Sequence, residues 1–220
     1  MAIIASTSGT FERELLPAGT YVARCYQMIH IGTVEEVILG EKKVMNKVRL
    51  TFELPHELRV FKEENGEQPM VLSREFTLSL HEKSGLRNFL KNWRGKDFSD
   101  QEASSFDVSK LIGVPCMLNV IHKDSKKGIT YAEIGNVSPL MKGMTCPAQI
   151  NPSQELSYDS FNWDLFNTLP DFIKDKIRSS LEFSKLKHDD IQQPKQTTTP
   201  MATSEAPVQV LNDIADDLPF

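Results

Sequence analysis

The sequence predicts a mainly β fold, a five-stranded barrel in which a single helix separates the third strand from the fourth. Two observations predict it. Apolar and polar residues alternate with a two-residue period in several short segments, as expected for strands that bury one face. Between the third and fourth of these segments the apolar period changes once, to that of an amphipathic helix.

Five segments are predicted as strands. The clearest covers 47–55, where apolar residues from Val48 to Leu54 alternate with polar ones. The other four have similar patterns and cover 20–31, 70–80, 113–122 and 129–137. Between the first three strands, segment 32–47 is expected to be a charged connection and segment 58–69 a loop or hairpin arm, because both are rich in Glu and Lys.

The first predicted strand is expected to alternate along its whole length. One parity carries Ala23 and Ile29, which are expected to face inward. The other parity carries Arg24, Tyr26 and His30, which are expected to face outward. This assignment places basic and aromatic side chains on the outer surface of the barrel.

The predicted helix follows the third strand. Leu86, Phe89, Leu90 and Trp93 recur at the spacing of one helical face, and Gly95 is expected to end the helix. Because Trp93 belongs to this apolar stripe, we expect it in the core. The resulting order, β-β-β-α-β-β, is that of an OB-fold barrel.

Composition divides the chain into four parts. Residues 1–16 are expected to form a flexible lead-in, and 17–143 the barrel. Residues 144–188 predict a helical extension, broken by Pro170, that packs on the barrel or forms a subunit contact. Residues 189–220 are rich in Gln, Pro, Thr, Ser and Ala and predict a disordered linker that ends in an acidic tip.

The net charge of -5 is a property of the end of the chain. Residues 189–220 hold six acids and one base, so residues 1–188 are neutral overall. Within 1–143 there are 19 bases and 18 acids. A neutral body binds phosphates only if its bases gather on one face.

Cysteine usage and hydropathy indicate a cytoplasmic protein. Three cysteines without CxxC spacing predict reduced thiols, with Cys25 and Cys116 packed inside strands, and neither a disulfide framework nor a zinc site. No apolar run approaches the ~20 residues that span a bilayer. The first residues lack the basic segment of a secretory signal. We therefore expect no membrane association.

The acidic tip has the features of a peptide ligand. A large apolar ring beside a terminal carboxylate suits a hydrophobic pocket with a basic rim, and a proline lowers the cost of ordering the peptide. The residues expected to contact partner proteins are Asp213, Asp216, Asp217, Leu218, Pro219 and Phe220.

The ending Asp-Asp-Leu-Pro-Phe, after a polar linker and a predicted barrel, resembles the C-terminal tip of bacterial single-stranded DNA-binding proteins. The late start of the barrel, its long charged connections and the helical extension make the body similar to the divergent members encoded by bacteriophages. The resemblance implies a protein of the bacterial cytoplasm, or of an infected bacterial cell, that acts in DNA replication, recombination and repair. It implies that the tip recruits proteins of these pathways, and it leaves a homo-oligomer open.

OB-folds hold single strands on the face of strands two and three, beside the loops that join strands 1–2 and 4–5. Bases stack on aromatic side chains while Lys and Arg follow the phosphates. The basic and aromatic residues expected at these places form the predicted DNA-contacting set: Arg24, Tyr26, Lys42, Lys43, Lys47, Arg49, Arg59, Phe61, Lys62, Lys123, Lys126, Lys127 and Tyr131.

The sequence leaves three other functions to compare with this one. A nuclease would need a metal site, for which Asp97, Asp100, Glu102 and Asp107 are the candidates, but their Ser- and Asp-rich setting predicts a loop with helix caps. No catalytic motif is present, so we expect neither an enzyme nor a metal or cofactor. A strand-annealing or recombination-mediator protein, and an adaptor whose barrel binds protein, remain alternatives.

Overall fold

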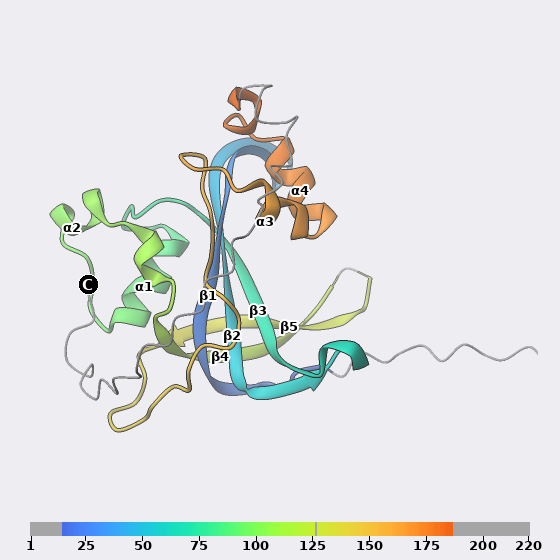
Figure 1. The fold of residues 1–220 in the computed structure, drawn as a ribbon. Coiled ribbons are helices and arrows are strands. Elements are labelled where there is room, and N and C mark those ends of the chain that lie inside the picture. Colours follow the sequence, from blue (N-terminus) through green and yellow to red (C-terminus); the bar gives the residue numbers. More distant parts are fainter. Residues whose placement is uncertain (1–14, 126, 187–220) are drawn as a thin grey trace, which may run out of the picture.

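The computed structural model describes residues 15–125 and 127–186 and is mainly β (Figure 1). Its central element is an antiparallel sheet with the order β3-β2-β1-β4-β5. The strands are β1 (Gly19–Ile38), β2 (Glu41–Val60), β3 (Glu67–Thr77), β4 (Pro115–Asp124) and β5 (Thr130–Ser138). A short sixth strand, β6 (Gln154–Leu156), pairs in parallel with β1 beyond the end of β4. The predicted acidic tip lies outside the described residues.

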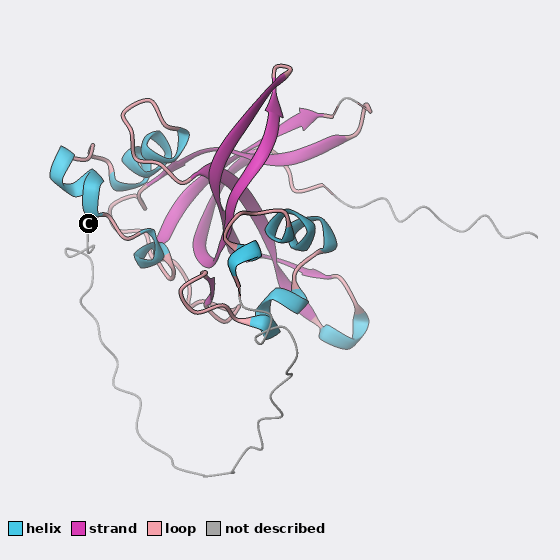
Figure 2. Cartoon of the chain, turned by 90° about the horizontal axis from the view of Figure 1, so that it is seen from above, coloured by secondary structure: helices cyan, strands magenta, loops and turns pink. Residues whose placement is uncertain are grey.

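Helices lie around the strands, as the view from above shows (Figure 2). The α-helices are α1 (Gly85–Arg94), α2 (Asp100–Ser105), α3 (Trp163–Thr168) and α4 (Asp171–Arg178), and the 3-10 helices are η1 (Glu63–Asn65), η2 (Val108–Leu111) and η3 (Phe183–Lys185). The expected helix between the third and fourth strands is confirmed as α1, but it is not the single helix predicted, because α2 and η2 also lie between β3 and β4. The Ser84 side chain caps its first turn by accepting a hydrogen bond from the Arg87 backbone N–H, and Gly95 ends it with a φ of 73°.

The main core lies between the inner face of the sheet and α1. Trp93 is 1% exposed there, and its ring centroid lies 5.4 Å from that of Phe52. The Trp93 indole N–H donates a hydrogen bond to the Pro115 carbonyl at 3.0 Å, so its polar atom is satisfied at the start of β4. The expectation that Trp93 belongs to the core is confirmed.

A second core lies between β1 and the C-terminal extension. Ile29 and Ile31 of β1 pack against α3 and α4, including Ile173 and Ile177. The extension therefore packs on the sheet, and Pro170 separates α3 from α4 as expected.

The simple alternation expected along the first strand is wrong. The pairing of β1 with β2 shifts by one residue between Cys25 and Gln27, which leaves Tyr26 in a bulge. After this bulge the parity of the strand reverses, so that Met28 enters the main core while Ile29 enters the second. β1 therefore buries both of its faces.

Segment 32–47 is a β-hairpin, and the expectation of a charged connection is wrong. β1 and β2 remain paired up to Ile38 and Glu41, around a two-residue turn in which Leu39 and Gly40 both have positive φ. The end of the hairpin extends beyond the rest of the sheet, so the charged side chains near its turn, Glu35, Glu41, Lys42 and Lys43, are exposed. Their abundance therefore does not mark a loop.

The two ends of the sheet are joined by a side chain. Arg74 of β3 donates hydrogen bonds to the carbonyl oxygens of Ile134 (2.9 Å) and Gly135 (3.4 Å) of β5. β3 and β5 are the outer strands of the order given above. Arg74 therefore ties the first half of the sheet to the second.

Candidate nucleic-acid interface

The outer face of β2 is closed at its centre by the chain itself. Glu53, on the polar parity of β2, is 0% exposed. Its carboxylate accepts hydrogen bonds from the backbone N–H groups of Ile150 (2.8 Å) and Asn151 (2.7 Å), and from the Asn151 side-chain amide (2.7 Å). Thr51, two residues earlier, is 3% exposed and donates to Gln27. The stretch before β6 thus covers the face on which the sequence placed the groove.

Arg24 and Tyr26 of the predicted set are both partly buried. The Arg24 guanidinium donates to the carbonyl oxygens of Gly113 and Pro147, so it binds β1 to the segments before β4 and β6. Tyr26 is half-buried in the bulge, and burial, with the nearby Glu53 carboxylate, raises its pKa. Arg24 therefore holds the extension in place, and Tyr26 is only partly accessible to a ligand.

Lys47 and Arg49 belong to a network that joins β1, β2, β3 and α4. We call Lys47, Arg49, Lys176, Glu36 and Glu75 the charged cluster. Lys47 pairs with Glu36 at 2.7 Å, and Arg49 with Glu75 at 3.4 Å. Lys176 of α4 pairs with Glu36 at 3.0 Å and with Glu75 at 2.6 Å. The hydrogen bond from Lys47 is the main reason that the pKa of Glu36 is lowered. Three cations face two carboxylates, which leaves one positive charge in excess.

An exposed aromatic ring adjoins this cluster. Phe172, in the first turn of α4, is 59% exposed, and the Arg49 guanidinium carbon lies 5.7 Å from its ring centroid. Phe172 is one of several apolar residues in the extension, and it is not among the residues predicted to contact DNA. Ile173 and Ile177, four residues apart, form the buried stripe of α4, and Phe172 lies about 100° away from Ile173. That offset is the signal in the sequence that could have identified it.

The β4–β5 hairpin carries another basic and aromatic surface. Lys123 and Tyr131 are cross-strand partners, and Tyr131 is 42% exposed. Lys123 pairs with Glu133 at 2.9 Å. Lys127, in the turn, is exposed and forms no ion pair within the described part of the chain. Lys126 lies outside the described residues.

The remaining predicted residues lie at the ends of the other two hairpins. Arg59, Phe61 and Lys62 lie at or just beyond the end of β2, where Phe61 is 53% exposed and Lys62 is 3.7 Å from Glu64. Lys42 and Lys43 lie at the tip of the β1–β2 hairpin, paired with Glu35 (2.7 Å) and Glu41 (3.4 Å). Exposed pairs of this kind contribute little to stability.

The predicted set is thus divided rather than collected in one groove. Three exposed aromatic rings remain beside cations: Phe172 next to the partly exposed charged cluster, Tyr131 in the β4–β5 hairpin, and Phe61 in the β2–β3 turn. In Figure 1 α4 and the β4–β5 hairpin both lie to the right of the β1–β2 strands, opposite α1 and α2. The β1–β2 tip is also exposed, but its large apolar side chains, Val37, Leu39 and Val44, are aliphatic and offer no ring for stacking.

Two of the four acids considered for a metal site, Glu102 and Asp107, cap helices instead, and Asp97 pairs with Arg87 and Lys91. The Ser99 backbone N–H and Arg94 lower the pKa of Glu102 to about 2, and Glu102 completes a capping box with Ser99. Asp107 caps η2, and hydrogen bonds from Lys91 and Arg87 hold the pKa of Asp97 well below its usual value. Among residues 15–125 and 127–186, no group of three or more His, Cys, Asp or Glu is placed to hold a metal ion.

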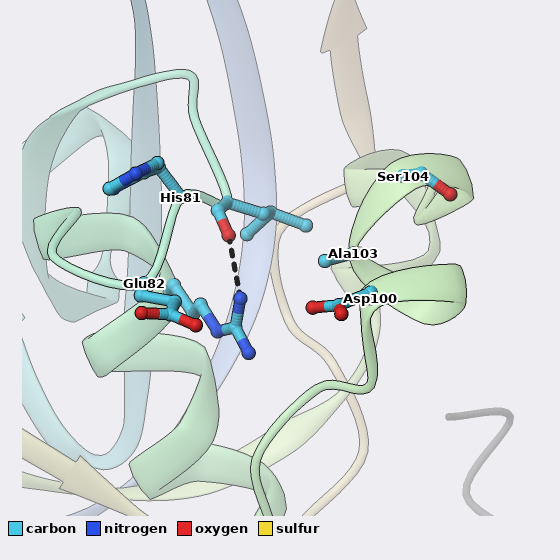
Figure 3. A pocket seen from close by; sticks show the side chains of 7 residues that line it. His81, Glu82, Asp100, Ala103 and Ser104 are labelled. Atoms are coloured by element: carbon cyan, nitrogen blue, oxygen red, sulfur yellow. Dashed lines mark hydrogen bonds between the residues drawn. The ribbon is translucent and has the colours of Figure 1, made fainter.

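A pocket of about 390 Å³ lies between the loop after β3, α1 and α2 (Figure 3). Arg87 lines it and donates hydrogen bonds to the Leu80 carbonyl (3.2 Å), the Asp97 carboxylate (3.0 Å) and the Phe98 carbonyl (2.7 Å). His81, Glu82, Asp100 and Ser104 are the polar side chains around it. Because Arg87 already binds three partners, its role is to fasten the connection between β3 and β4.

Cys25 and Cys116 are buried thiols, as expected from their strands, and burial raises the pKa of Cys25 to about 12.

Within the described residues, no helix has the length and apolarity needed to cross a membrane.

The geometry therefore offers exposed aromatic rings beside cations on a small β-sheet, a combination that suits unpaired bases and their phosphates. Compared with known protein families, with curated proteins and with solved structures, the chain matches none of them, so the interpretation of these surfaces rests on their own chemistry.

Proposed function

We propose that this protein binds and protects single-stranded DNA with an OB-fold barrel. The observation that carries the proposal is the strand order β3-β2-β1-β4-β5, with α1 between β3 and β4 and with aromatic and basic residues exposed at the hairpin ends. Closure between β3 and β5 would complete the barrel, and the hydrogen bonds from Arg74 to β5 support it.

Unpaired DNA would follow the exposed groups and not the centre of β2. Bases would stack on Tyr131 and Phe61, and phosphates would approach Lys123, Lys127 and Arg59. The face over Glu53 is occupied by the chain itself, so the path would run beside that cover. This route differs from the groove that strand order alone predicts.

In this proposal the barrel binds DNA, and the acidic tip has the separate role of binding other proteins. Asp216, Asp217, Leu218, Pro219 and Phe220 would bind proteins of DNA replication, recombination and repair, in the cytoplasm of a bacterial or phage-infected cell. The resemblance of this ending to bacterial single-stranded DNA-binding proteins supports it.

Binding should be specific for unpaired strands and steeply dependent on salt. With about five to eight phosphates engaged, affinity for a dT oligonucleotide should fall on the order of 10²- to 10³-fold between about 50 and 200 mM salt. Fluorescence anisotropy of a labelled dT oligonucleotide, with a duplex of equal length as competitor, measures this. No binding to the single strand at the lower salt would refute the proposal and favour an adaptor whose barrel binds protein.

Removing residues 213–220 should separate the two roles. We expect DNA affinity to stay equal or to rise, because a competing polyanion is removed, while partner capture is lost. The same anisotropy titration and a side-by-side pull-down with full-length and truncated chains measure the two effects. Replacing Thr197, Thr198 and Thr199 by Ala in the linker is the matched control and should change neither. A truncated chain that still captures the same partners would contradict the role of the tip.

A further inference from the structure

Phe172 is held in a fixed position while its ring is left in water. Its neighbour Ile173 is 1% exposed and Ile177 is 0% exposed, so α4 is anchored on β1 by a different face of the helix, about 100° from Phe172. Lys176, one turn further on, fastens α4 to Glu36 and Glu75. The backbone at Phe172 is therefore held by other residues of α4, and the ring itself is not packed. An aromatic side chain on a backbone that is already fixed loses less entropy when a base stacks on it.

Arg49 lies beside this ring and links it to the sheet. Its guanidinium carbon is 5.7 Å from the Phe172 ring centroid, and Glu75 holds the same guanidinium at 3.4 Å. Arg49 has 23% of its side chain exposed, so it is still accessible to a ligand. An aromatic ring in contact with an arginine matches what an unpaired nucleotide needs, because the base stacks and the phosphate is neutralised.

The net charge around the Phe172 ring is only slightly positive, so charge alone favours a phosphate only weakly. The charged cluster has one cation in excess. Lys174 of α4 is paired with Asp171 at 2.9 Å, so this pair adds no net charge near the ring. The Asp171 side chain is 91% exposed. Stacking must therefore supply most of the binding at this place, with Arg49 and Lys176 as the cations within reach.

We infer that the C-terminal extension is part of the nucleic-acid site: Phe172 stacks on an unpaired base, and the Arg49 guanidinium forms an ion pair with the adjoining phosphate. The inference rests on the proposed function and deepens it. It assigns a binding role to α4, which would otherwise serve only to cover β1.

Variants at Phe172 test the inference by anisotropy with labelled dT oligonucleotides. Phe172→Ala should weaken binding about tenfold, the loss expected for one base–aromatic contact. Phe172→Trp should bind as well as the wild type and show emission that dT quenches beyond the wild-type change. Leu181→Ala, which removes another exposed apolar side chain (55% exposed) of the extension, is the matched control and should leave affinity unchanged.

An oligonucleotide without bases separates stacking from charge. If Phe172 stacks, Phe172→Ala and wild type should bind an abasic strand equally, because only the phosphates remain. An equal loss of affinity on dT and on the abasic strand would overturn the stacking role. Wild-type affinity of Phe172→Ala for dT would overturn the inference and leave the proposed function standing. Failure of the wild type to bind dT at all would overturn both.

Discussion

Replacing Glu53 by glutamine is expected to lower the free energy of unfolding by about 2–3 kcal/mol. The Glu53 carboxylate is wholly buried and accepts three hydrogen bonds, two of them from backbone N–H groups of Ile150 and Asn151. Glutamine keeps the shape of the side chain but turns one acceptor into a donor. A buried N–H would then face another donor, and the covering segment would lose at least one of its three hydrogen bonds to β2.

Urea unfolding followed by circular dichroism measures this loss. Glu67→Gln is the matched control, because Glu67 is exposed at the start of β3 and should change stability by less than about 0.5 kcal/mol. Hydrogen exchange gives an independent readout, since the backbone N–H groups of Ile150 and Asn151 should exchange faster in the Glu53 variant. Equal stability and equal exchange in the Glu53→Gln protein would show that the carboxylate does not hold the cover.

Replacing Trp93 by alanine is expected to cost about 3–5 kcal/mol of stability. Its ring fills the space between α1 and the sheet, with ring centroids 5.4 Å from Phe52 and 6.2 Å from Phe89. Its removal leaves a large cavity and an unpaired Pro115 carbonyl. The effect should therefore appear in folding, with no separate defect in binding by the fraction that remains folded.

The measurement is again urea unfolding, combined with DNA titration at a temperature where the variant is folded. Asn88→Ala is the control on the same helix, because Asn88 is exposed and alanine is the better helix former. Its stability should be unchanged or slightly higher. A stable Trp93→Ala protein with strongly reduced DNA affinity would contradict the core assignment and make Trp93 a stacking residue.

Local patterns were sufficient for elements that bury one face against one partner. The apolar spacing from Leu86 to Trp93, with Gly95 after it, predicted α1 because only neighbours in sequence decide it. The alternation from Val48 to Leu54 predicted the core side of β2 for the same reason. Pro170 predicted the break between α3 and α4, since proline cannot continue a helix.

Other features depended on contacts between distant segments. Glu53 has the same polar parity as Arg49, yet Glu53 is fully buried because residues nearly 100 positions later lie over it. Alternation distinguishes the two faces of a strand, but it does not say what covers the outer one. Tyr26 shows a second limit, because a bulge reverses the parity without any mark in composition.

The sequence by itself determined the order of strands and helix, the core side of β2 and α1, and the concentration of acid in 189–220, because each follows from neighbouring residues. Only the tertiary structure decided which polar face stays open to a ligand. Arg24 binds backbone carbonyls, whereas Phe172 lies in water beside Arg49. The physical reason is that exposure is set by what packs above a residue, and in this chain that cover comes from the extension after β5.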